Sequence, residues 1–160
     1  MSTVSDPASK IWFEDFKPGS VTEYGPRVVT REEILSFAAE FDPQPMHLDE
    51  EAARQTMLGG LSASGWHTCC LMMRMIADGF ILNSSSMGAN AVDEVKWHAP
   101  VRPGDALTVR ATVLETRASK NRPSMGIVSM LFEVFTGKGQ KVMTMKSPLL
   151  MALRDPGKAA

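Results

Sequence analysis

Two residues that can exchange protons near neutral pH stand five positions apart, in the segment Asp42-Pro-Gln-Pro-Met-His47. A carboxylate and an imidazole held close together can take a proton from water and return one to a substrate. The two prolines restrict the backbone between them. Asp42 and His47 are therefore the candidate acid–base pair. Two simpler interpretations stay open, because an aspartate beside proline often only shapes a turn and a single histidine is often structural.

A glycine-rich stretch, Gly59-Gly-Leu-Ser-Ala-Ser-Gly65, leads into an apolar run over residues 66–80. If that run is a helix, the backbone N–H of Gly65 lies at its N-terminus, where a partial positive charge favours a negatively charged oxygen. Glycine also lets a ligand approach the backbone closely. These properties make Gly65 a candidate functional residue. Close packing of the helix on a sheet would explain this glycine equally well.

Three basic residues are clustered further along, in Arg117-Ala-Ser-Lys120-Asn-Arg122-Pro. They could bind the phosphates of a ligand, and a solvated turn is the simpler alternative. The two cysteines, Cys69 and Cys70, are neighbours. Adjacent residues rarely reach disulfide geometry, and two ligands at that spacing do not make a zinc site. We expect buried reduced thiols, no metal site and, as the default, a cytoplasmic location.

The composition is that of one ordinary globular domain, with 160 residues of which 44% are hydrophobic and 22% charged. The net charge of −1 gives no electrostatic basis for binding nucleic acid or an anionic membrane. Residues 1–10 are polar and carry no apolar run like that of a secretory signal, so we expect a disordered tail there. Residues 66–80 are too few and too charged to cross a bilayer.

Helices are predicted by capping residues and by apolar spacing. Thr30 and Glu33 form a capping box at the start of an apolar stripe that ends before the prolines. After an irregular segment over residues 42–47, Asp49 can cap a short helix. The second long helix, residues 66–80, is apolar on nearly every side, so other elements must cover it on several faces.

The later half of the chain has the period of two that is typical of strands. Strands are expected at residues 91–97, 107–113, 128–134 and 142–151, with a weaker one at 21–29. Gly137-Lys-Gly139 predicts a hairpin between the last two, and Pro148 predicts a sheet edge or a bulge. The fold class is therefore α+β, with a twisted antiparallel sheet wrapped around one central apolar helix.

The sequence resembles the MaoC-like dehydratase family, which includes the R-specific enoyl-CoA hydratases. The family motif reads Asp, any residue, Asn, Pro, any residue, His, and is followed by a small-residue segment that ends in Gly at the central helix. Besides the Asp42 and Gly65 segments, the resemblance includes Phe13-Glu-Asp-Phe-Lys-Pro-Gly19 and Pro100-Val-Arg-Pro-Gly-Asp105. It implies a single hot-dog domain over residues 11–154, a short tail at 155–160, and a homodimer.

The same resemblance implies a lyase that hydrates a 2-enoyl-CoA to a (3R)-hydroxyacyl-CoA, or runs the reverse dehydration. Coenzyme A is then part of the substrate, and no metal or redox cofactor is implied. Asp42 and His47 would be the acid and base, and the Gly65 N–H would meet the thioester carbonyl. With such a substrate, the basic residues Arg117, Lys120 and Arg122 become candidates to contact the coenzyme A phosphates, within one chain or from the neighbouring subunit.

The chain departs from the family pattern at two places. Gln44 stands where the family usually has asparagine, and the longer amide cannot make the same short hydrogen bond unless the loop shifts. Met72 and Met73 occupy the helix position where some R-specific hydratases carry a serine, so no third catalytic contact is expected there. Two alternatives therefore stay open: an acyl-CoA thioesterase on the same fold, and a non-catalytic subunit that binds an acyl thioester.

Overall fold

The structure is a computed structural model that describes residues 10–156. The predicted tails, residues 1–10 and 155–160, lie outside the described residues except at their inner ends. Within the described part of the chain, no helix is long and apolar enough to cross a membrane.

One antiparallel sheet of five strands, in the order β1-β3-β4-β5-β2, forms the body of the molecule. The strands are β1 (Val21–Val28), β2 (Glu94–Trp97), β3 (Ala106–Ala118), β4 (Met125–Phe135) and β5 (Lys141–Ala152). All five predicted strands are present. The period of two that predicted β3 and β4 appears in the structure as alternation between buried and half-buried residues over 106–113 in β3 and 126–135 in β4. β2 pairs with only four residues of β5, and Pro148 lies beyond them, where β5 pairs with β4 but not with β2. This position fits the sheet edge that Pro148 predicted.

The helices are α1 (Arg31–Phe41), α2 (Pro45–Leu48), α3 (Glu50–Arg54) and α4 (Gly65–Gly79), with short 3₁₀ turns η2 (Phe13–Asp15) and η3 (Ile81–Asn83). Thr30 and Glu33 form the predicted capping box of α1, and Asp49 caps α3. The prediction of an irregular segment over residues 42–47 is wrong for its second half. Pro45 begins a helical turn there, because its fixed φ suits the first position of a helix and its missing N–H is not needed at that position.

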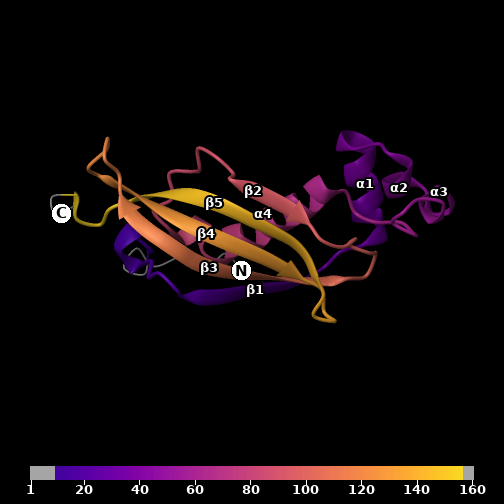
Figure 1. The fold of residues 1–160 in the computed structure, drawn as a ribbon, viewed down its shortest axis with the longest axis horizontal. Helices are drawn as coiled ribbons and strands as arrows, with labels where there is room; N and C mark the ends of the chain where they lie inside the picture. The colour runs from indigo at the N-terminus through magenta and orange to yellow at the C-terminus, as the bar shows by residue number, and fades with distance from the viewer. Residues whose placement is uncertain (1–9, 157–160) are drawn as a thin grey trace, which may run out of the picture.

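Helix α4 lies against the sheet, behind the strands in Figure 1. Its side chains Leu71, Met72, Met75 and Ile76 are buried in one cluster with the inward-facing residues of β3, β4 and β5. The molecule is therefore α+β, with a five-stranded antiparallel sheet covering a central apolar helix, as predicted.

One stripe of α4 is not covered by the chain's own sheet. Trp66, Cys70 and Met73, spaced at one and two helical turns, are all exposed. The expectation that both cysteines are buried is therefore wrong for Cys70. Its neighbour Cys69 is half-buried, and burial raises the pKa of that thiol to about 11. An exposed apolar stripe on a helix is typical of a surface that contacts another chain.

The two predicted groups of functional residues lie at opposite ends of the molecule. Helices α1, α2 and α3 lie together beyond one end of the sheet, whereas the turn between β3 and β4 lies at the other end, with the C-terminus (Figure 1). The Asp42–His47 segment is thus far from the Arg117–Arg122 turn within one chain.

Candidate active site

The end of α1 and the turn of α2 bring Asp42 and His47 together. Asp42 is the C-cap residue directly after α1, and His47 lies in α2. The Nε2 atom of His47 is 3.4 Å from Oδ2 of Asp42, and the two side chains are 9% and 15% exposed. The structure therefore places the predicted acid–base pair in one partly shielded position, where charge interactions are stronger than at the surface.

A backbone carbonyl fixes which nitrogen of His47 is available for chemistry. Nδ1 of His47 is 2.7 Å from the carbonyl oxygen of Ser62. A carbonyl oxygen can only accept, so we assign the proton to Nδ1, which donates to Ser62. Nε2, the nitrogen that faces Asp42, is then the one that can accept a proton and later release it.

Both oxygens of the Asp42 carboxylate accept hydrogen bonds from side chains. Ser64 Oγ donates to Oδ2 at 2.6 Å, and Gln44 Nε2 donates to Oδ1 at 2.7 Å. These two bonds, the one from Ser64 first, and the nearby His47 hold the pKa of Asp42 below its usual value. The carboxylate is therefore ionised at neutral pH. The long amide of Gln44 reaches Asp42 itself, so this departure from the family motif supports the carboxylate rather than displacing it.

Helix α4 begins at Gly65, which is in contact with a tryptophan of strand β2. Trp97 Nε1 donates to the carbonyl oxygen of Gly65 at 2.9 Å. A Cβ atom added at Gly65 would lie 2.5 Å from the Trp97 ring, closer than non-bonded carbon atoms pack. Close packing therefore requires a glycine at this position. The Gly65 N–H lies in the first turn of α4, where N–H groups have no intrahelical acceptor.

Asp42, His47 and Gly65 line a single cavity of about 490 Å³. Trp66 and Trp97 form part of its wall, with ring centroids 5.4 Å apart in an edge-to-face arrangement. Trp66 also borders a second, mainly apolar cavity of about 500 Å³, which is lined by residues of α4, of the segment between α4 and β2, and of β4 and β5. The arrangement combines the candidate acid–base pair and a helix N-terminus with neighbouring apolar space.

The site offers acid–base groups and backbone donors. Among the described residues, no group of three or more His, Cys, Asp or Glu side chains is placed to hold a metal ion. The chemistry that these residues can perform is the transfer of a proton at His47 Nε2 and Asp42, together with the binding of an oxygen at the start of α4.

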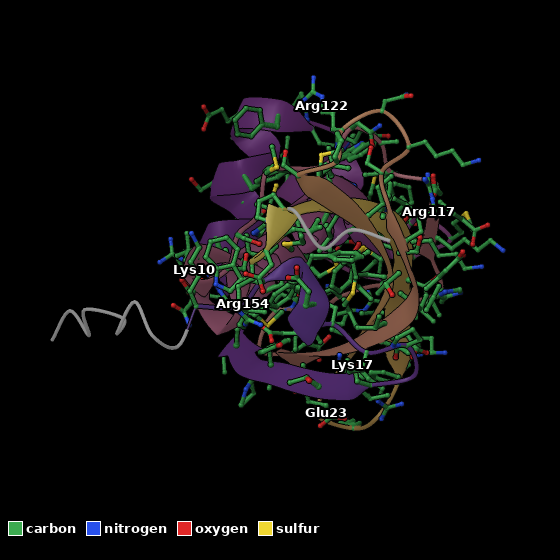
Figure 2. All side chains as sticks on the ribbon, turned by 90° about the vertical axis from the view of Figure 1, so that its left-hand side faces the viewer. Lys10, Lys17, Glu23, Arg117, Arg122 and Arg154 are labelled. Atoms are coloured by element: carbon green, nitrogen blue, oxygen red, sulfur yellow. The ribbon has the colours of Figure 1, made fainter. Side chains whose placement is uncertain are left out.

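The three predicted basic residues form a separate group. Arg117 lies near the end of β3, Lys120 and Arg122 lie in the turn that follows, and all three line a cavity of about 650 Å³. Figure 2 looks onto this end of the molecule, where Arg117 and Arg122 are labelled. The structure does not bring these residues to the Asp42–His47 cavity of the same chain.

Two residues of the site were not predicted from the sequence. Ser64 directly precedes a helix, and a serine at that position predicts a helix cap, not a contact with Asp42. Trp97 was predicted only as part of a strand, and nothing in the sequence pairs it with Gly65. Both contacts join residues that are far apart in the chain, by 22 and 32 positions.

Comparisons with known proteins agree with this architecture. The family model of the MaoC like domain matches residues 15–131. The uncharacterized protein YdeM of Bacillus subtilis is 32% identical over 130 residues, which cover 81% of this chain and 90% of that protein. A (R)-specific enoyl-CoA hydratase of Rhodospirillum rubrum is 29% identical over 108 residues, 64% of this chain and 69% of that protein.

A solved structure extends the likeness to three dimensions. The crystal structure of a MaoC-like dehydratase from Rhodospirillum rubrum superposes with a TM-score of 0.83 and 36% identity, covering 91% of this chain and 99% of that chain. The fold is thus the hot-dog fold that the sequence resemblance implied. Because the family model spans well over half of the chain and the motif residues gather in one cavity, the chain belongs to the MaoC-like dehydratase family.

Proposed function

We propose that the protein is a hydro-lyase that adds water to a 2-enoyl-CoA to give a (3R)-hydroxyacyl-CoA, or removes it in the reverse direction. The observation that carries this proposal is the arrangement of Asp42, His47 and the N-terminus of α4 around one cavity. The (R)-specific enoyl-CoA hydratase of Rhodospirillum rubrum, a distant relative, supports the reaction class.

In the proposed hydration, His47 transfers the proton. With Nδ1 donating to Ser62, the free Nε2 takes a proton from water as the water oxygen bonds to C3 of the substrate. Asp42, ionised and 3.4 Å away, stabilises the imidazolium that forms. Nε2 then gives the same proton to C2, so that one molecule of water has been added and His47 is neutral again.

The backbone N–H of Gly65 has the other role in this mechanism. As water attacks C3, negative charge develops on the thioester oxygen, and a fixed donor at a helix N-terminus stabilises that charge. Removing one such donor typically costs about 10²–10³-fold in rate in enzymes with an oxyanion hole. The apolar cavity beside Trp66 offers space for the acyl chain.

The assembly that we propose is a symmetric homodimer. In residues 10–156, β2 pairs with β5 only, which leaves its other edge open. Trp97 lies in β2 and contacts Trp66, which lines one cavity with Met73 and Val92. All four side chains are exposed. Open hydrogen-bonding groups next to exposed apolar surface favour association with a second copy across a two-fold axis.

Such a two-fold axis would also give the basic cluster a role. If two β2 edges pair antiparallel, the end of one chain that carries Arg117, Lys120 and Arg122 lies beside the partner's α1–α3 end. The guanidinium and ammonium groups could then bind the phosphates of a coenzyme A whose acyl group enters the partner's cavity.

A panel of 2-enoyl-CoA thioesters of several chain lengths tests the reaction. Loss of the conjugated enoyl absorbance, with chiral analysis showing the (3R)-hydroxy product, is the result that we expect for at least one length. If no member of the panel loses its absorbance while binding is demonstrated by calorimetry, the proposal is wrong and a non-catalytic binding protein is the better description.

A further inference from the structure

A buried serine directly before α4 does not cap the helix with its side chain. Ser64 occupies the N-cap position, where a serine side chain ordinarily accepts a hydrogen bond from an N–H group of the helix. Within the described residues, the Ser64 side chain makes no such cap. It is fully buried and donates instead to Oδ2 of Asp42 at 2.6 Å. The helix thus forgoes a stabilising cap in favour of a contact with Asp42.

The oxygen that Ser64 holds is the oxygen that faces the histidine. Oδ2 of Asp42 is both the acceptor of the Ser64 hydrogen bond and the atom 3.4 Å from His47 Nε2. A charge-assisted O–H···O⁻ bond of this length is among the stronger hydrogen bonds in proteins, so it fixes the carboxylate in one orientation. The same bond is the largest cause of the lowered pKa of Asp42.

Ser64 also affects the start of the helix. A side chain that caps a helix occupies one of its free N–H groups. Because the Ser64 hydroxyl is turned toward Asp42, it does not compete for the N–H groups of the first turn, which begins at Gly65. The Ser64 hydroxyl therefore affects both the Asp42–His47 pair and the start of α4.

We propose that Ser64 is a positioning residue for the proposed hydration: its hydroxyl aims Oδ2 of Asp42 at His47 Nε2 and leaves the N-terminus of α4 open to the thioester oxygen. This inference rests on the proposed function. Ser64 itself does not touch the reacting atoms, and it acts through Asp42 and through the helix.

The test is Ser64→Ala, examined by two measurements. In the ligand-free protein, ¹³C NMR follows the titration of the Asp42 carboxyl carbon, which is identified as the signal missing from Asp42→Asn. We expect the midpoint of the titration to move upward, because the carboxylate has lost its strongest donor. With an active 2-enoyl-CoA, kcat should fall by about 10- to 100-fold with little change in KM, the range that corresponds to one hydrogen bond to a charged group.

A matched control separates positioning from a general loss of packing. Ser85 is likewise buried, at 5% exposed, and its Oγ donates to the carbonyl oxygen of Ala152 at the far end of the sheet. Ser85→Ala should leave both the Asp42 titration and kcat unchanged. Ser64→Gly is a second test, because glycine is well tolerated at an N-cap and also lacks the hydroxyl. It should reproduce the effects of Ser64→Ala.

The outcomes are distinct. An unmoved Asp42 midpoint in folded Ser64→Ala and Ser64→Gly, or a moved midpoint with unchanged kcat, would overturn the positioning role. If the wild-type protein converts no 2-enoyl-CoA, the proposed function fails. The NMR titration needs no substrate, so it would still decide whether Ser64 controls Asp42.

Discussion

Replacing Gly65 by alanine tests the close contact on which the site is built. The new Cβ would lie 2.5 Å from the Trp97 ring, so the ring must retreat by about 1 Å to reach an ordinary carbon–carbon contact. That movement strains or breaks the bond from Trp97 Nε1 to the Gly65 carbonyl. Overpacking of this kind typically costs about 1–3 kcal/mol. For a chain of this size the cost corresponds to a fall in Tm of roughly 2–12 °C, measurable by thermal melts followed by circular dichroism.

A second substitution shows whether contact with Trp97 causes the loss of stability in Gly65→Ala. In a Trp97→Ala background the space beside Gly65 is open, so Gly65→Ala should be neutral or slightly stabilising, since alanine is the better helix former. Gly137→Ala is a control, because a Cβ there would meet its nearest atom at 3.7 Å, and it should leave Tm unchanged. A Gly65→Ala variant that melts like the wild type, or whose loss of stability is the same with and without Trp97, would show that the Trp97 contact does not require glycine.

The acid–base pair, the basic cluster and the two-fold assembly can each be tested separately. Asp42→Asn and His47→Ala should each reduce turnover of an active 2-enoyl-CoA by about 10²–10⁴-fold in steady-state assays, and a folded His47→Ala variant with near-normal turnover would exclude it as the proton-transfer group. Neutralising Arg117, Lys120 and Arg122 together should raise KM with little effect on kcat and weaken the salt dependence of KM, whereas an unchanged KM would leave the cluster a plain turn. Sedimentation at micromolar concentration should show a dimer, and a stable monomer would contradict the two-fold assembly.

Local signals in the sequence predicted the elements well. The capping box of Thr30 and Glu33 and the cap at Asp49 depend on residues three positions apart, so their geometry is set by the backbone of a single turn. Asp42 and His47 came together as predicted because only four residues, two of them prolines, separate them. The same local reasoning failed at Pro45, which was treated as a helix breaker although proline is favourable in the first turn.

The contacts that complete the site could not be predicted in this way. Ser64 reaches Asp42 across 22 positions, and Trp97 reaches Gly65 across 32. These contacts depend on how α4 enters the sheet and on the register of β2 with β5, which no pattern within one element encodes. The exposure of Cys70 has a similar origin, since apolar spacing indicates that a helix is buried but not whether its own chain or another chain covers each face.

The most direct test of the proposed reaction compares a 2-enoyl-CoA with the saturated acyl-CoA of the same length, while a thiol reagent reports any free coenzyme A. Both a hydratase and a thioesterase would bind the thioester near Gly65, and they differ in whether water attacks C3 or the carbonyl carbon. We expect that the enoyl substrate loses its conjugation and yields the (3R)-hydroxyacyl-CoA, that no thiol is released, and that the saturated thioester is inert. Rapid release of thiol from the saturated substrate would instead identify a thioesterase.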